Sequence, residues 1–101
     1  MAKTSSVEKN NRRIKMAKQY AGKRAKLKEM AVDDRLTPEE RFGARLKLAK
    51  LPRNSSPTRL HNRCDLSGRA RGYYRKVRLS RIALREFANF GQVPGMTKAS
   101  W

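Results

Sequence analysis

The chain has 101 residues, with 26 Lys and Arg against 8 Asp and Glu, a formal net charge of +18 and a sequence pI near 11.3. This length allows one small domain at most, and no run approaches the 18 or more apolar residues that a membrane span requires. The N-terminus has no apolar core of the kind that a secretory signal contains, so we expect a cytoplasmic protein. Charge of this size opposes compaction and is relieved by a polyanion such as nucleic acid.

The positive charge is divided between two parts of the chain. Residues 1–30 hold ten basic and two acidic residues, residues 31–51 hold five and four, and residues 52–101 hold eleven and two. A nearly neutral middle segment therefore separates two cationic segments. This division indicates a protein that binds its partner with two separate surfaces.

Residues 1–36 read as a basic helical arm. Good helix formers predict a helix over 5–31, which lacks proline. Gly22 weakens or bends this helix, so the sequence leaves open whether the arm is one helix or two. A thin apolar stripe means that the arm needs a partner surface to be fully ordered. The predicted stripe is Val7, Ile14, Ala17, Ala21 and Ala25.

Residues 37–51 carry the clearest local helix signal. Thr37 is a suitable N-cap, Pro38 suits the first helical position, and Glu40 completes a capping box. Pro52 ends the helix. Phe42, Leu46 and Ala49 are expected on one face, and Phe42, Leu46 and Leu48 are suited to packing within the protein or against another protein.

Residues 52–63 contain two prolines and no helical period, which predicts an extended linker or loop that the prolines stiffen. Residues 64–101 form a C-terminal module that we expect to bind RNA. Within it, Ser80–Phe90 reads as a short helix capped by Ser80 and ended by Gly91. Its expected apolar side is Ile82, Phe87 and Phe90, and the chain closes with Trp101. The fold class is therefore mainly α.

Between Asp65 and Glu86 the chain has seven basic residues and no acidic one. Arginine pairs with phosphate through two hydrogen bonds and stacks on bases, which suits folded RNA. Tyr73 and Tyr74 either stack on bases or pack on the following helix. The predicted RNA-binding residues are Arg12, Arg13, Lys15, Lys18, Arg53, Arg59, Arg63, Arg69, Arg71, Tyr73, Tyr74, Arg75, Lys76, Arg78, Arg81 and Arg85.

Catalysis and metal binding are not expected. His61 and Cys64 have no third, orienting group and no core large enough for a dry pocket. Cys64 and Ser67 have the spacing of one zinc knuckle, and Ser80 and Ala83 have that of a second, but three of four sulfurs are missing. We expect no cofactor, no metal, no small-molecule substrate and no enzymatic activity.

Three runs of the chain, LPRNSSPTRLHNRC, SGRARGYYRKVRLSRIALRE and PGMTKASW, resemble the family of the universal fourteenth protein of the small ribosomal subunit. The resemblance spans nearly the whole chain and is most specific in its second half. Within this family, the chain resembles the long bacterial form, which lacks zinc. The shorter form carries cysteines at the positions of Cys64, Ser67, Ser80 and Ala83.

The resemblance implies a small, extended protein whose C-terminal module is like a zinc ribbon but lacks metal. It implies binding to the 3′ domain of small-subunit ribosomal RNA, in the head. Assembly of the head and ordering of the aminoacyl-tRNA site are implied too. Expected neighbours are the third, tenth and nineteenth proteins of the subunit. The alternative from composition is a nucleoid-type cationic DNA-binding protein.

Overall fold

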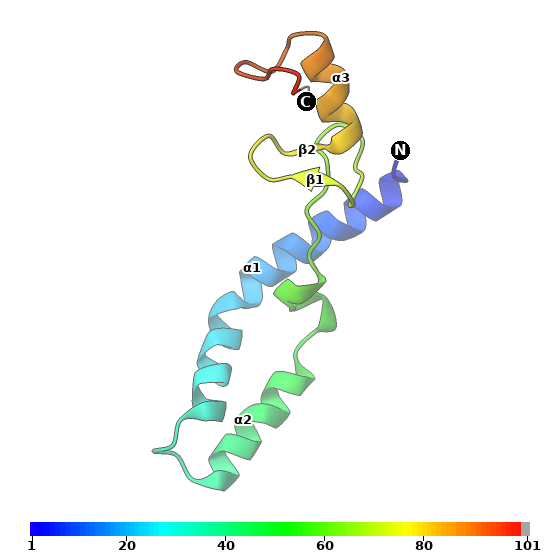
Figure 1. The fold of residues 1–101 in the computed structure, drawn as a ribbon. Coiled ribbons are helices and arrows are strands. Elements are labelled where there is room, and N and C mark those ends of the chain that lie inside the picture. The colour runs from blue at the N-terminus through cyan, green and yellow to red at the C-terminus, as the bar shows by residue number, and fades with distance from the viewer. Residues whose placement is uncertain (100–101) are drawn as a thin grey trace. The chain divides into compact units, whose positions relative to one another are not determined.

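The computed structural model describes residues 1–99, and Trp101 lies outside the described residues. The chain divides into two compact units. The helical unit is Lys9–Leu60, and the C-terminal unit joins Met1–Glu8 to the described residues from His61 onward. The structure is mainly helical, as predicted (Figure 1). No helix within residues 1–99 is long and apolar enough to cross a membrane.

Helix α1 (Thr4–Val32) is a single element, which answers the question left open at Gly22. A Cβ on Gly22 would have no neighbour within 4 Å, so this glycine faces open space. The predicted apolar stripe is partly wrong, because Ala21 and Ala25 are exposed. The positions of the helix beyond Glu8 that are not exposed fall mostly at steps of three and four, and they are Asn10, Arg13, Ile14, Met16, Ala17, Tyr20, Arg24, Leu27 and Ala31.

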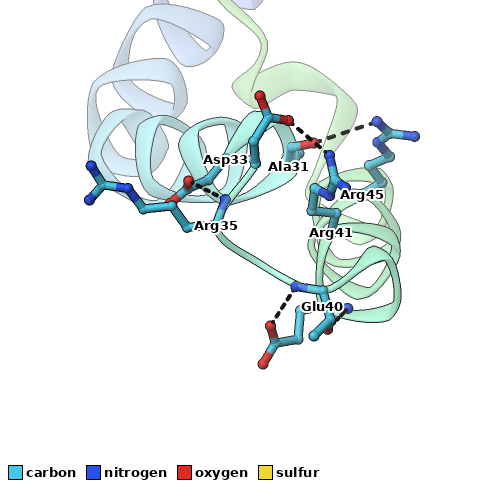
Figure 2. A network of polar contacts seen from close by, with 8 residues as sticks. Ala31, Asp33, Arg35, Glu40, Arg41 and Arg45 are labelled. Atoms are coloured by element: carbon cyan, nitrogen blue, oxygen red, sulfur yellow. Dashed lines mark hydrogen bonds and ion pairs between the residues drawn. The ribbon is translucent and has the colours of Figure 1, made fainter.

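A tight connection leads from α1 to α2 (Pro38–Lys50). The predicted capping box is present, because Glu40 N donates to Thr37 Oγ1 (3.4 Å) and Thr37 N donates to a Glu40 carboxylate oxygen (3.1 Å). Two arginines of α2 reach back across the connection (Figure 2). Arg41 pairs with Asp34 (3.2 Å), and Arg45 donates to the Ala31 carbonyl (3.5 Å).

The predicted apolar face of α2 is its exposed face. Phe42 is 60% exposed and Leu46 is 49% exposed, while Ala44 is 2% exposed. Leu48 is half-buried. Packing inside the helical unit therefore uses the small side chain, and the two larger ones remain free of it.

Residues 52–60, which we call the strap, form a loop of short turns, so of the two predicted alternatives the extended one is wrong. They form two single 3-10 turns, η1 (Arg53–Ser55) and η2 (Pro57–Arg59), and a proline precedes or opens each. Ser55 is buried, and its Oγ accepts a hydrogen bond from Arg24 Nε (3.0 Å). Arg13 donates to the Arg59 carbonyl (3.4 Å). Arginines of α1 thus hold the strap in place.

The C-terminal unit contains a two-residue antiparallel ladder followed by a helix. Strand β1 (Tyr73–Tyr74) pairs with β2 (Leu79–Ser80), with Tyr73 opposite Ser80 and Tyr74 opposite Leu79. Helix α3 (Arg81–Asn89) follows at once, and Ala83 N donates to the capping Ser80 Oγ (3.3 Å). Gly91 has a φ of +70°, which agrees with its predicted role at the helix end.

The core of this unit is small. Its buried residues include Cys64, Ser80, Ala83 and Leu84. The expected apolar side of α3 is partly wrong, because Ile82 is 47% and Phe90 is 79% exposed, although Phe87 is half-buried. Leu66, at 59%, is exposed as well. The buried side of α3 carries Ala83 and Leu84 instead.

Candidate nucleic-acid interface

The loop between β1 and β2 presents cations on a fixed backbone. Arg78 closes the loop in the left-handed region, with a φ of +57°, and its N–H donates to the Tyr74 carbonyl (2.8 Å). Two interactions of Asp65 with Arg78 stabilise this turn. Its N–H donates to the Arg78 carbonyl (3.2 Å), and its carboxylate lies 3.3 Å from Arg78 Nε. Arg75 and Lys76 stand exposed at the tip.

Two glycines are required where the backbone passes close to other segments. Gly68 has a φ of +68°, and a Cβ there would lie 2.9 Å from Val7 Cγ2 and 3.2 Å from Ala2 Cβ. The N-terminal residues are held at this point, because Ala2 N donates to the Ser67 carbonyl (3.0 Å). Gly72 has a φ of +63°, and its carbonyl accepts from Arg81 N.

Three of the four positions with zinc-knuckle spacing, Cys64, Ser67 and Ser80, meet at the Cys64 sulfur. Burial raises the pKa of the Cys64 thiol, but hydrogen bonds from the backbone N–H groups of Ser67, Ser80 and Leu66 outweigh this effect. The net effect lowers the pKa from 9.0 to about 6. These bonds tie the turn after Cys64 to the start of α3.

The residues present do not fit zinc. A tetrahedral zinc site takes four nitrogen or sulfur ligands, and of the four positions only Cys64 supplies one. Within residues 1–99 no group of three His, Cys, Asp or Glu side chains could hold a metal ion.

The structure assigns the predicted RNA-binding residues to both units. In the C-terminal unit, Tyr73, Arg63 and Arg69 are half-buried. Arg63 donates to the Gly68 carbonyl (2.8 Å), and the Nε atoms of Arg63 and Arg69 are buried with no hydrogen-bond partner among the described residues. The predicted residues of this unit that stand exposed are Arg71, Tyr74, Arg75, Lys76, Arg78, Arg81 and Arg85.

In the helical unit the predicted residues fall into two kinds. Arg13 and Arg59 are half-buried and joined by the bond that holds the strap, so both also have a structural role. The exposed ones are Arg12, Lys15, Lys18 and Arg53. These four are free to meet an external anion.

Two residues with positioning roles were missed from the sequence. Arg24 fixes the strap through Ser55 and the Pro52 carbonyl, and Asp65 fixes the cationic loop through Arg78. Arg24 lies seven residues after Ala17 and seven before Ala31, at the heptad-like spacing of the covered face. Asp65 offered a weaker signal, as an isolated acid beside a run of arginines.

Comparison with known proteins gives the family. Residues 47–100 match the model of the family described as ribosomal protein S14p/S29e. The chain is 61% identical to the small ribosomal subunit proteins uS14 of Hyphomonas neptunium and Cereibacter sphaeroides, over 101 residues and the full length of each. The uS14 of Beijerinckia indica is 60% identical over the same span. These relatives are ribosomal proteins rather than enzymes, and the resemblance found in the sequence is confirmed. The chain belongs to the ribosomal protein S14p/S29e family.

Proposed function

We propose that this chain is a structural, RNA-binding protein of the small ribosomal subunit. Its full-length relatives carry that subunit in their names. The observation that carries the proposal is the loop between β1 and β2. Arg75 and Lys76 are exposed at its tip, and the nearby carboxylate of Asp65 is paired with Arg78 and not with them. Cations held on a fixed backbone without acidic partners suit the phosphates of folded RNA.

The proposed mechanism is electrostatic and conformational. Each cation that meets a phosphate releases a condensed counterion, so the affinity depends steeply on salt. Arg63 and Arg69 are half-buried, so their charge lies close to the surface that the RNA would contact.

The helical unit supplies a second RNA-binding surface. Arg12, Lys15 and Lys18 lie exposed on α1, and Arg53 lies exposed on the strap. The Arg13 and Arg24 bonds keep the strap, and with it Arg53, beside this cationic helix. The surface agrees with the two-part charge distribution of the sequence.

Finer assignments follow from the family resemblance. We propose that the RNA is the 3′ domain of the small-subunit ribosomal RNA, in the head, and that binding supports head assembly and orders the aminoacyl-tRNA site. The third, tenth and nineteenth proteins are the proposed neighbours, in the cytoplasmic ribosome. The exposed Phe42 and Leu46 on α2, which lies in the nearly neutral segment 31–51, favour a protein as the partner of that face.

The C-terminal unit is best explained as a zinc ribbon that has lost its metal. The backbone N–H groups of Ser67 and Ser80 both donate hydrogen bonds to the Cys64 sulfur, and Ala83 N donates to Ser80 Oγ. Three of the four ligand positions of the metal form thus still meet at this sulfur, and the fourth follows in the first turn of α3. Hydrogen bonds and the bound RNA take the place of the ion in stabilising the module.

The proposal is tested by binding of the full chain to a 3′-domain rRNA fragment across a salt series. We expect replacement of Arg75 and Lys76 by glutamine to reduce the log–log salt slope by about 1 per cation removed. Replacement of Lys47 and Lys50 on α2 is the matched control and should leave the slope unchanged. A flat salt dependence for the unmodified chain would refute the mechanism, and equal affinity for duplex DNA would favour the DNA-binding alternative.

A further inference from the structure

A groove in the C-terminal unit lies between β1, α3 and the segment that follows α3. Figure 1 shows this last segment turning back beside the helix. Tyr74 contributes from the strand, Arg81, Arg85 and Asn89 line the groove from the helix, and Met96 and Lys98 close it from the returning segment. All of these residues belong to one unit, so the groove is defined within it.

The groove has an aromatic wall with apolar neighbours. Adjacent strand residues point to opposite faces, and Tyr74 is 52% exposed while Tyr73 is half-buried. Ile82 and Met96, which also line the groove, are 47% and 46% exposed. A flat ring open to solvent beside aliphatic side chains is the surface on which unpaired bases stack.

The rim of the same groove is cationic. Arg81 and Arg85 are one helical turn apart and therefore lie on the same face of α3. Within residues 1–99 neither forms an ion pair, and Lys98 adds a third cation against the one lining carboxylate, Glu86. An apolar wall with a positive rim matches a ligand that is flat at one end and anionic at the other.

Arg81 is already held in position. Its N–H donates to the Gly72 carbonyl (2.6 Å), and a Cβ on Gly72 would lie 3.1 Å from both Arg81 Cγ and Cδ. The stem of this arginine therefore lies across the glycine beside the strand. Glu86 and Asn89 add an acceptor and an amide, which can pair with the polar edge of a base.

We propose that this groove holds one unpaired nucleotide of the RNA, with its base stacked on Tyr74 and its phosphate bound by Arg81 and Arg85. This assignment rests on the proposed RNA-binding function and deepens it. It also answers the question that the sequence left open for the two tyrosines: Tyr74 stacks on RNA, and Tyr73 packs within the protein. An acidic peptide of a neighbouring protein is the competing occupant.

The test uses the full chain, a single-stranded RNA 12-mer, the same 12-mer with abasic sites, and the rRNA fragment. Tyr74→Leu keeps apolar bulk but removes the ring, and should weaken binding of the 12-mer roughly 5- to 100-fold. Binding of the abasic strand should change much less. Tyr74→Phe should recover most of the loss, and Tyr20→Leu on α1 controls for removal of a tyrosine elsewhere.

The outcomes separate this proposal from the proposed function. If the unmodified chain does not bind the rRNA fragment, the proposed function fails. If that binding holds but Tyr74→Leu binds the 12-mer as tightly as the unmodified chain, the nucleotide groove is refuted. Competition by a glutamate-rich peptide as effective as the 12-mer would likewise assign the groove to a protein. Circular dichroism of each variant confirms that the helices are retained.

Discussion

Asp65 and Arg78 are joined both through their backbones and through their side chains. The Asp65 N–H donates to the Arg78 carbonyl at 3.2 Å, and the Asp65 carboxylate lies 3.3 Å from Arg78 Nε. Arg78 has a φ of +57°, so the pair holds a non-glycine residue in a conformation that L-residues avoid. The turn therefore combines a backbone cost with a compensating ion pair at the base of the cationic loop.

The balance of these two effects predicts the outcome of replacing Arg78. Left-handed backbone costs a non-glycine residue about 1–2 kcal/mol, whereas an ion pair whose side chains are 71% and 53% exposed is worth about 0.5 kcal/mol or less. Arg78→Gly relieves the larger cost, and Arg78→Ala loses the pair without relieving it. We expect the glycine variant to be about 1 kcal/mol more stable than the alanine variant in urea unfolding. Equal stability of the two variants would contradict the assigned backbone conformation.

A pair of glycines with opposite surroundings gives a second prediction. At Gly68 a Cβ would meet Val7 at 2.9 Å in left-handed backbone, while at Gly22, inside α1, it would meet nothing within 4 Å. Gly68→Ala should lower the free energy of unfolding by about 2–3 kcal/mol. Gly22→Ala should raise it by about 0.5–1 kcal/mol, because alanine favours the helix. Thermal unfolding of both variants checks the contrast, and a stabilised Gly68→Ala chain would show that the N-terminal residues are not held there.

Local signals predicted the helices and their ends, while the buried faces were predicted less well. Thr37 and Ser80 act as caps because capping needs only residues three positions apart. Which side of a helix becomes buried depends on distant segments. The contact of Arg24 with Ser55 spans 31 residues, and the spacing of Arg24 on α1 does not reveal this partner. Composition does not mark the buried face either, because Ala31 and Ala44 are buried whereas Ala21 and Ala25 are exposed.

The same contrast applies to the candidate interface. Charge and spacing identified the arginine-rich tract, because an excess of cations is visible in composition alone. The sequence could not show which cations are already engaged. Arg13 and Arg78 bond within the chain, and Arg75 stays free. That division arises from backbone carbonyls and one carboxylate brought near by folding.

The lowered pKa of Cys64 predicts a pH dependence of stability. In the folded chain the pKa is about 6 instead of 9.0, so the thiol binds its proton less tightly when folded than when unfolded. Its contribution to stability is therefore fully present above about pH 9 and is lost as the pH falls through about 6. We expect the stability advantage over Cys64→Ser to grow between these values. Thiolate absorbance in the ultraviolet gives the midpoint directly. A titration midpoint that stays near 9 would contradict the proposal that hydrogen bonds stabilise the Cys64 thiolate.

Restoring the missing sulfurs tests whether the C-terminal unit keeps the geometry of a zinc ribbon. Replacing Ser67, Ser80 and Ala83 by cysteine would place four thiolates at Cys-x2-Cys spacing, and such sites bind zinc tightly. We expect one zinc per chain by elemental analysis and a rise in unfolding temperature that chelator reverses. The control carries only the Ser80 and Ala83 replacements, which supply three sulfurs and lose the Ser80 cap as well. Absence of stoichiometric zinc from the four-cysteine chain, with its helices intact, would contradict the proposal that this unit descends from a metal ribbon.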